Sequence, residues 1–164
     1  MKIRQLLCLL AFVAFIFSSC SKDGDGGDYR DKYEGIYATD VVGLVELEDL
    51  NLIVLSRNEH ENIVVNKYGV NQLMLLFEQG GYVTVTVNED GNFTVPDESF
   101  TEPIIDPETG DKLTLNITIS ITGTITNRML YIRMVYSGDG LLEVGGVKYP
   151  SSLAGTVAYN GTKK

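Results

Sequence analysis

The chain has 164 residues, with 13 lysines and arginines against 22 aspartates and glutamates, and a formal net charge of −9. A chain this negative repels phosphates, which excludes nucleic acids as partners. Two cysteines and a single histidine are too few for the usual thiolate or histidine metal sites.

The first twenty residues have the pattern of a bacterial lipoprotein signal. Lys2 and Arg4 precede an unbroken apolar run from Leu6 to Phe17, and Ser18-Ser19-Cys20 follows. This pattern predicts a signal peptide over residues 1–19, cleaved before Cys20, whose thiol carries the lipid. The alternative, a transmembrane helix, is disfavoured because twelve helical residues span about 18 Å, short of the roughly 30 Å hydrocarbon core.

Processing at Cys20 changes the chemistry of the mature chain. Removal of residues 1–19 takes away two basic residues and no acidic one, so 11 basic and 22 acidic side chains remain, a net charge of −11. Cys8 is removed and lipid occupies Cys20, so no free thiol is left. The sequence therefore excludes a cysteine nucleophile, a disulfide and a redox pair.

Residues 20–28 are predicted to form the lipidated cysteine and a flexible acidic linker. The stretch from Ser21 to Asp28 has three glycines and no apolar residue, so it cannot bury surface. Its spaced aspartates lack the glutamate that closes a calcium loop, which favours a spacer. An acidic stretch directly after the lipidated cysteine resembles the surface-export signal of Bacteroidetes-type lipoproteins. That resemblance implies a lipid-anchored outer-membrane protein at the cell surface, with the periplasmic face as the alternative.

Residues 29–164 are predicted to form one all-β domain, long enough for a single core. Runs rich in β-forming residues cover 36–47, 50–56, 62–67 and 72–77, the last of which would also suit a helix. Between 83 and 87, valines alternate with polar residues, and Glu89-Asp90-Gly91-Asn92 has the composition of a tight turn. A short run at 93–95 follows and ends at Pro96.

The clearest alternation lies in the second half of the chain. Apolar and polar residues alternate from Leu113 to Thr126, and a second alternating segment runs from Leu130 to Tyr136. The short Asn127-Arg128 link predicts an antiparallel hairpin. Runs at 142–147 and 154–159 complete a total of about eight to ten strands.

Sequential hairpins favour an antiparallel, about eight-stranded barrel, because closure removes exposed edges. A β-sandwich is the alternative. A membrane-spanning barrel is disfavoured, since the strands lack aromatic girdles at both ends.

The order of several short motifs carries a resemblance. Tyr33-Glu34-Gly35-Ile36-Tyr37 opens the domain, and Gly123-Thr124-Ile125 and Leu130-Tyr131-Ile132 fall near its end. This order resembles the small calycin-like, lipocalin-like lipoproteins of Bacteroidetes. The resemblance implies a closed or nearly closed barrel, in which Gly-x-Tyr stands where lipocalins have Gly-x-Trp: the glycine permits close packing and the aromatic ring closes the barrel end. It implies no substrate and no catalytic residues.

Two polar segments are the places to search for chemistry. His60 lies within Arg57 to Asn62, which is interpreted as a hairpin loop between two strands rather than a pH-sensitive site. Residues 89–111 hold eight acidic and no basic side chains. They would serve as a calcium site, a patch for a cationic partner, or a long solvated loop, and Pro96, Pro103 and Pro107 favour the loop.

The sequence thus predicts a protein that is not an enzyme and needs no cofactor or metal. Nucleophile-elbow, phosphate-loop and zinc-hydrolase motifs are all missing from it. The leading expectation is a non-enzymatic cell-envelope lipoprotein whose barrel binds a small apolar ligand in its interior or mouth. The alternative is a surface module that binds a protein or glycan, or inhibits a basic protein, through its acidic face.

Overall fold

The structure, a computed structural model, describes residues 28–106 and 108–164. The predicted signal peptide, Cys20 and all of the linker except Asp28 lie outside these residues. In the part of the chain that is described, no helix has the length and apolar character needed to cross a membrane.

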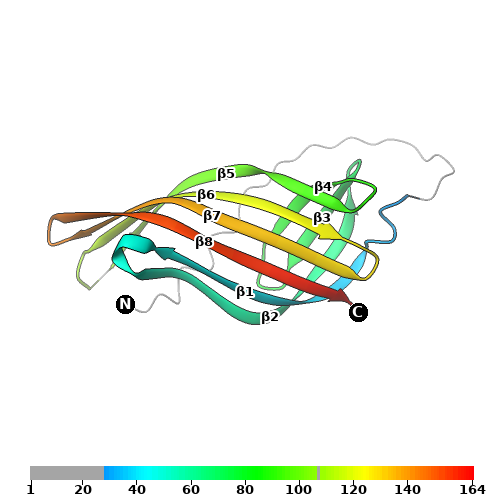
Figure 1. Cartoon of the computed structure of the whole chain (residues 1–164), viewed down its shortest axis with the longest axis horizontal. Helices are drawn as coiled ribbons and strands as arrows, with labels where there is room; N and C mark the ends of the chain where they lie inside the picture. The colour runs from blue at the N-terminus through cyan, green and yellow to red at the C-terminus, as the bar shows by residue number, and fades with distance from the viewer. Residues whose placement is uncertain (1–27, 107) are drawn as a thin grey trace.

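Eight antiparallel strands close into a barrel, which confirms the predicted barrel over the sandwich (Figure 1). Each strand pairs with the next in sequence, and β8 pairs with β1 from Tyr37 opposite Lys163 to Leu47 opposite Leu153. The elements are β1 (Gly35–Leu47), the 3-10 helix η2 (Glu48–Leu50), β2 (Leu52–Tyr68), β3 (Gln72–Phe77), β4 (Tyr82–Val87), β5 (Asn92–Ile105), β6 (Lys112–Ile125), β7 (Met129–Val144) and β8 (Val147–Lys163).

The barrel wall is complete at one end only. Strands β3 and β4 have six residues each, whereas β2 has 17 and β5 has 14. The short strands cover one half of the length in Figure 1. Strand β4 meets β5 only at Thr86–Thr94 and Val87–Phe93. Beyond these pairs, no described strand lies beside residues 52–61 of β2 or 96–105 of β5 on the side that faces the gap.

Alternate side chains of each strand fill the interior, as period-two patterning requires. The alternation is clearest on β1, where every second residue from Tyr37 to Val41 is buried and the residues between them are exposed. Fully buried apolar side chains come from seven strands: Tyr37, Val41 and Leu47 of β1, Ile63 and Val65 of β2, Leu73 and Leu75 of β3, Val85 of β4, Leu115 and Ile125 of β6, Leu130 and Ile132 of β7, and Val157 of β8. Most of them fill the complete end of the barrel, whereas Leu47 and Leu115 lie beside Gly140 toward the other end, where Leu47 is opposite Leu52 and Leu153.

The segment before β1 closes the complete end. Tyr33 and Tyr37 are both fully buried, and the Tyr37 hydroxyl lies 2.9 Å from the carbonyl oxygen of Tyr33 and 3.0 Å from that of Thr126. Gly35 has a φ of +144°, and a Cβ there would lie 2.6 Å from Cε of Lys163. Tyr37 thus occupies the complete end of the barrel.

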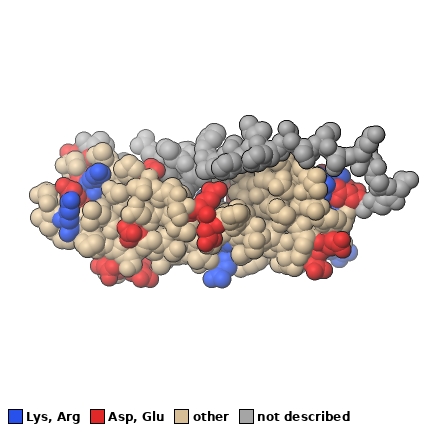
Figure 2. All heavy atoms as spheres, turned by 90° about the horizontal axis from the view of Figure 1, so that it is seen from above, with Lys and Arg blue, Asp and Glu red and all other residues tan. Residues whose placement is uncertain are grey.

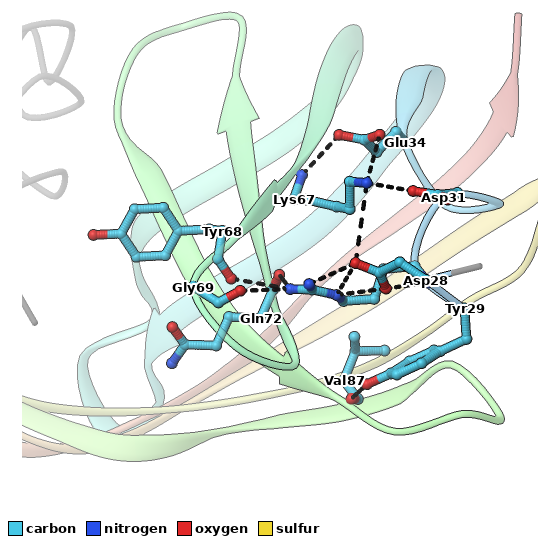
Figure 3. Close-up of polar contacts among 10 residues, drawn as sticks. Asp28, Tyr29, Asp31, Glu34, Lys67, Tyr68, Gly69, Gln72 and Val87 are labelled. Atoms are coloured by element: carbon cyan, nitrogen blue, oxygen red, sulfur yellow. Dashed lines mark hydrogen bonds and ion pairs between the residues drawn. The ribbon is translucent and has the colours of Figure 1, made fainter. Parts of the chain in front are cut away.

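Arg30 ties this segment to the barrel (Figure 3). Its guanidinium donates hydrogen bonds to the carbonyl oxygens of Tyr68, Gly69 and Gln72 at 3.3, 2.8 and 3.0 Å. The same group pairs with Asp28, with 2.6 Å between Nη2 and Oδ2. Hydrogen bonding to Arg30 lowers the pKa of Asp28 to about 2. The three carbonyls belong to the β2–β3 connection, so Arg30 holds the short strands in place.

The prediction of a long loop over residues 89–111 is wrong for most of that segment. Strand β5 runs from Asn92 to Ile105, and only the turns on either side of it are loop. Pro96 lies within a bulge where the register shifts between Val95 and Glu98. Pro96 therefore has no paired residue on β6, which suits a residue without an N–H group.

The prediction of a polar hairpin loop around His60 is also wrong. Strand β2 is continuous from Leu52 to Tyr68, and His60 lies opposite Asp40 of β1 in the register. Its Nδ1 is 2.5 Å from Oδ1 of Asp40, and the side chain is 88% exposed. His60 therefore points outward from the barrel wall. The run at 142–147, expected as a strand of its own, is the hairpin tip where β7 ends and β8 begins.

Candidate binding site

Three charged side chains of β2 point into the barrel. Arg57, Glu59 and Glu61 share a face with Ile63 and Val65, which are fully buried. Side chains of a strand alternate between its two faces, so the charged residues continue the interior row. They lie where β3 ends, because Ile63 is opposite the last residue of β3. The charged row therefore marks the level at which the wall opens.

Both carboxylate oxygens of Glu59 have a close polar neighbour. One carboxylate oxygen, Oε1, is in close ionic contact with Nε of Arg57. The other, Oε2, accepts a hydrogen bond of 2.8 Å from the side-chain amide of Gln79, in the turn between β3 and β4. In the same turn, Glu78 accepts two hydrogen bonds from Asn62, from its backbone N–H at 2.7 Å and its side-chain amide at 2.8 Å. The β3–β4 turn thus rests against β2 beside the charged row.

Glu61 is buried and poorly satisfied. The residue is 5% exposed, and among the described residues the Gln79 backbone N–H and the Arg57 guanidinium approach its carboxylate without either reaching good hydrogen-bonding geometry. The nearest cationic atom, Nη2 of Arg57, lies 3.9 Å from Oε2. Its backbone is satisfied, since Thr39 donates its hydroxyl proton to the Glu61 carbonyl at 2.7 Å. The group of Glu61 that lacks a hydrogen bond is therefore its carboxylate.

Burial raises the pKa of Glu61 above its usual range. The Arg57 charge opposes this rise, the charges of Glu59 and Glu78 add to it, and the nearby backbone of Gln79 opposes it weakly. Desolvation penalises the charged form of a carboxyl group, whereas a cation at close range favours it. Arg57 is shared with Glu59, so burial is the larger effect.

Aromatic side chains from three other strands line the same region. Tyr136 of β7 and Tyr159 of β8 are buried, and Phe77 at the end of β3 meets Tyr159 edge to face, with 5.6 Å between ring centroids. Burial raises the pKa of both tyrosines, with the nearby Arg57 charge opposing that rise in each. Both phenols therefore stay protonated at neutral pH, and that of Tyr136 donates a weak hydrogen bond of 3.8 Å to the Met134 sulfur.

The geometry does not resemble a hydrolytic pair. Glu59 and Glu61 stand two residues apart on the same face of one strand, so they lie side by side. Glycoside cleavage needs two carboxyl groups on opposite sides of the scissile bond. Across residues 28–106 and 108–164, no three histidine, cysteine or acidic side chains gather in a way that would hold a metal ion.

The described residues of the acidic segment are spread over a strand and two turns. Most of its acids lie on β5 or in the flanking turns, and Asp106 accepts a hydrogen bond from the Glu108 backbone at 2.9 Å. This contact lowers the pKa of Asp106. Figure 2 shows acidic and basic side chains scattered over a mostly uncharged face rather than gathered in one patch.

A concave region lies beside the β4–β5 turn, and none of the three charged residues lines it. A shallow depression of about 570 Å³ is lined by Tyr29, both flanks of the β4–β5 turn and Asn71. Tyr29 forms its wall by donating a hydrogen bond of 2.8 Å to the Val87 carbonyl. The depression is open to solvent, so it lacks the enclosure that retains a small apolar molecule.

The sequence prediction missed Arg57, Glu59 and Glu61 as a group. They lie in the segment that was interpreted as a loop because of its charge. A signal was present, since Leu55, the three charged residues, Ile63 and Val65 occupy alternate positions without a break. A period-two row that continues through charged residues indicates a strand with a polar interior position.

Fold and site together define an antiparallel up-and-down barrel of eight strands, with a charged interior row at the level where its wall becomes incomplete. No known family, curated protein or solved structure matches the chain.

Proposed function

We propose that this protein is a non-enzymatic lipoprotein of the cell envelope whose barrel binds a small ligand beside Glu61. Lipid on Cys20 would hold it in the outer membrane, with the barrel at the cell surface or, alternatively, at the periplasmic face. The observation that carries the proposal is the buried Glu61 carboxylate, which lacks a hydrogen-bond partner among the described residues. Buried polar groups in folded proteins nearly always have partners, so one without a partner indicates a ligand or ordered water.

The surroundings of Glu61 suit a ligand with an apolar body. Phe77, Met134, Tyr136 and Tyr159 offer apolar and aromatic surface around a few polar groups, the usual composition of a small-molecule site. No described strand lies beside residues 52–61 of β2 on the side that faces β5, so a ligand would reach Glu61 between these two strands.

Native mass spectrometry tests this proposal. The full chain would be incubated with a lipid and small-molecule extract of a bacterial envelope and then desalted. We expect a discrete added mass on the wild-type protein and on Glu48→Gln, a variant that loses one exposed carboxylate in η2. We expect no added mass on Glu61→Gln. A bare mass for the wild type across several extracts would contradict the proposal.

The unpaired strand edges favour a second candidate function, binding of a protein. An extended segment of a partner could add to β5, whose residues 96–105 lack a neighbour on one side among the described strands. Exposed Asp97 and Glu98 on that edge favour a basic partner. In this case a basic protein would cross-link to residues 96–105 at low salt, salt added before the cross-linker would prevent that cross-link, and no small ligand would be retained.

A further inference from the structure

The charged row inside the barrel carries one uncompensated negative charge. Arg57 contributes one positive charge, and Glu59 and Glu61 each contribute a negative one when ionised. Glu59 has an ion pair with Arg57 and a hydrogen bond from the Gln79 side chain, whereas Glu61 has only the Arg57 guanidinium at 3.9 Å and the nearby Gln79 backbone. A buried charge without a close partner is costly, so Glu61 favours any group that supplies a positive charge and donates hydrogen bonds.

The aromatic groups near Glu61 favour the same kind of group. Tyr136 and Tyr159 keep neutral phenols, and the faces of tyrosine and phenylalanine rings attract cations. The Tyr136 hydroxyl lies 3.8 Å from the sulfur of Met134, which adds a polarisable apolar wall. Carboxylate, aromatic rings and thioether together match an ammonium group on a short hydrocarbon chain.

We propose that the ligand of the barrel is a small organic cation, an alkylammonium whose N–H groups bind the Glu61 carboxylate and whose carbon chain packs on Phe77, Met134 and Tyr159. This inference rests on the proposed function and names the chemical class of its ligand. A neutral alcohol would satisfy a hydrogen bond but would leave the charge uncompensated. A ligand carboxylate or phosphate would add a negative charge to the two already present.

The proposal makes ligand and proton competitors for Glu61. The charged groups that face Glu61 are Arg57 and Glu59 on β2, Glu78 in the β3–β4 turn, and the Tyr159 phenol on β8. Burial raises the pKa of Glu61 above its ordinary value. Ammonium binding should therefore tighten as the pH rises through the range in which Glu61 loses its proton, with release of a proton on binding.

The test is calorimetric titration of the full chain, in non-ionic detergent, with n-pentylammonium and with 1-pentanol as the neutral control. Alkylammonium groups stay charged at pH 8, because they titrate near 10.4 as lysine does. We expect n-pentylammonium to bind more tightly at pH 8 than at pH 5, to release a proton, and to bind at least about tenfold more tightly than 1-pentanol, as a charge-assisted hydrogen bond implies. Equal binding of the two probes would overturn the proposal.

Two variants test whether the cation binds at the Glu61 carboxylate. Glu61→Gln keeps the shape of the side chain and should weaken n-pentylammonium binding about tenfold or more, whereas Glu48→Gln should leave it unchanged. Equal affinity in the wild type and Glu61→Gln would overturn the proposal. The pH dependence of the wild type provides a second measurement that does not depend on a folded variant. An added neutral or acidic mass in the native mass spectrum would overturn the amine class while leaving the proposed function standing.

Discussion

Arg57 and Glu61 lie four residues apart on β2, yet Nη2 of Arg57 is 3.9 Å from Oε2 of Glu61. Four residues of strand span about 13 Å, so the guanidinium must reach along the strand past Glu59 to approach Glu61. Glu59 contacts Nε of the same arginine. One guanidinium therefore faces two carboxylates, and the more buried of them has the weaker contact.

This arrangement predicts that Glu61→Gln stabilises the protein at high pH. Burial raises the pKa of Glu61 in the folded state above its ordinary value of 4.5. The folded state then binds the proton more tightly than the unfolded state, so the wild type loses stability as the pH rises from about 4.5 through the folded pKa. We expect the free energy of unfolding of the variant to exceed that of the wild type by about 1 kcal/mol at pH 8.

Urea unfolding at pH 4 and pH 8 would measure this difference. At pH 4 the wild-type carboxyl group is protonated in the folded state, so the two proteins should be nearly equal. A variant that is less stable than the wild type at pH 8 would show that the Glu61 carboxylate is well paired, in contradiction to the structure.

We expect Arg30 to make the main contribution to holding the segment before β1 against the barrel. Its guanidinium donates to three carbonyl oxygens of the β2–β3 connection, and its side chain is 13% exposed. Arg30→Ala should lower the free energy of unfolding by about 2 kcal/mol, since hydrogen bonds from a charged donor are lost together. Arg133→Ala, on the exposed face of β7, should have no such effect. Equal stability of the two variants in urea would contradict this role.

Two glycines with positive φ should respond differently to alanine. Gly91 has a φ of +85°, and a Cβ there would lie 1.9 Å from the carbonyl oxygen of Ile125. Gly110 has a φ of +75° and open space around it. Gly110→Ala should cost about 1 kcal/mol for the backbone conformation alone, whereas Gly91→Ala should cost about 3 kcal/mol because the β6 backbone must also move. Thermal unfolding of both variants compares the two costs, and equal losses would contradict the close approach.

The alternating segments were predictable because one face of each strand is buried. The hairpin predicted around Asn127-Arg128 is present, with β6 ending at Ile125 and β7 beginning at Met129. The local pattern of apolar and polar residues does not indicate that β1 pairs with β8, because this pairing joins two segments at opposite ends of the domain. The barrel was therefore inferred from the number and order of the strands.

The errors have one physical origin. Charges and prolines were interpreted as loop, but a strand without a neighbour on one side accepts both. On β5, Pro96 lies in a bulge beside a free edge, and on β2, Glu59 and His60 continue the strand on opposite faces. Because the candidate site lies in that part of β2, the errors in the strand and in the site arose together.

Lipid attachment is expected at Cys20 and depends on the sequence alone, since this residue lies outside the described part of the chain. Cys20→Ala should abolish labelling by a radioactive fatty acid in the producing bacterium and leave residues 1–19 attached, because the lipidated thiol defines the cleavage site. Cys8→Ala is the matched control and should be labelled and cleaved normally. Labelling that persists in Cys20→Ala would contradict the lipoprotein assignment.

The most direct test of ligand binding in the barrel uses the methyl groups of methionine. The chain has four methionines, and Met134 lies inside the barrel with 9% exposure, whereas Met129 is 61% exposed on the surface. Carbon-13 labelling of the methionine methyl groups would report on both residues as the ligand found by mass spectrometry, or n-pentylammonium, is added. The account predicts that the Met134 signal moves and saturates while the Met129 signal stays in place. A ligand that binds without moving the Met134 signal would contradict it.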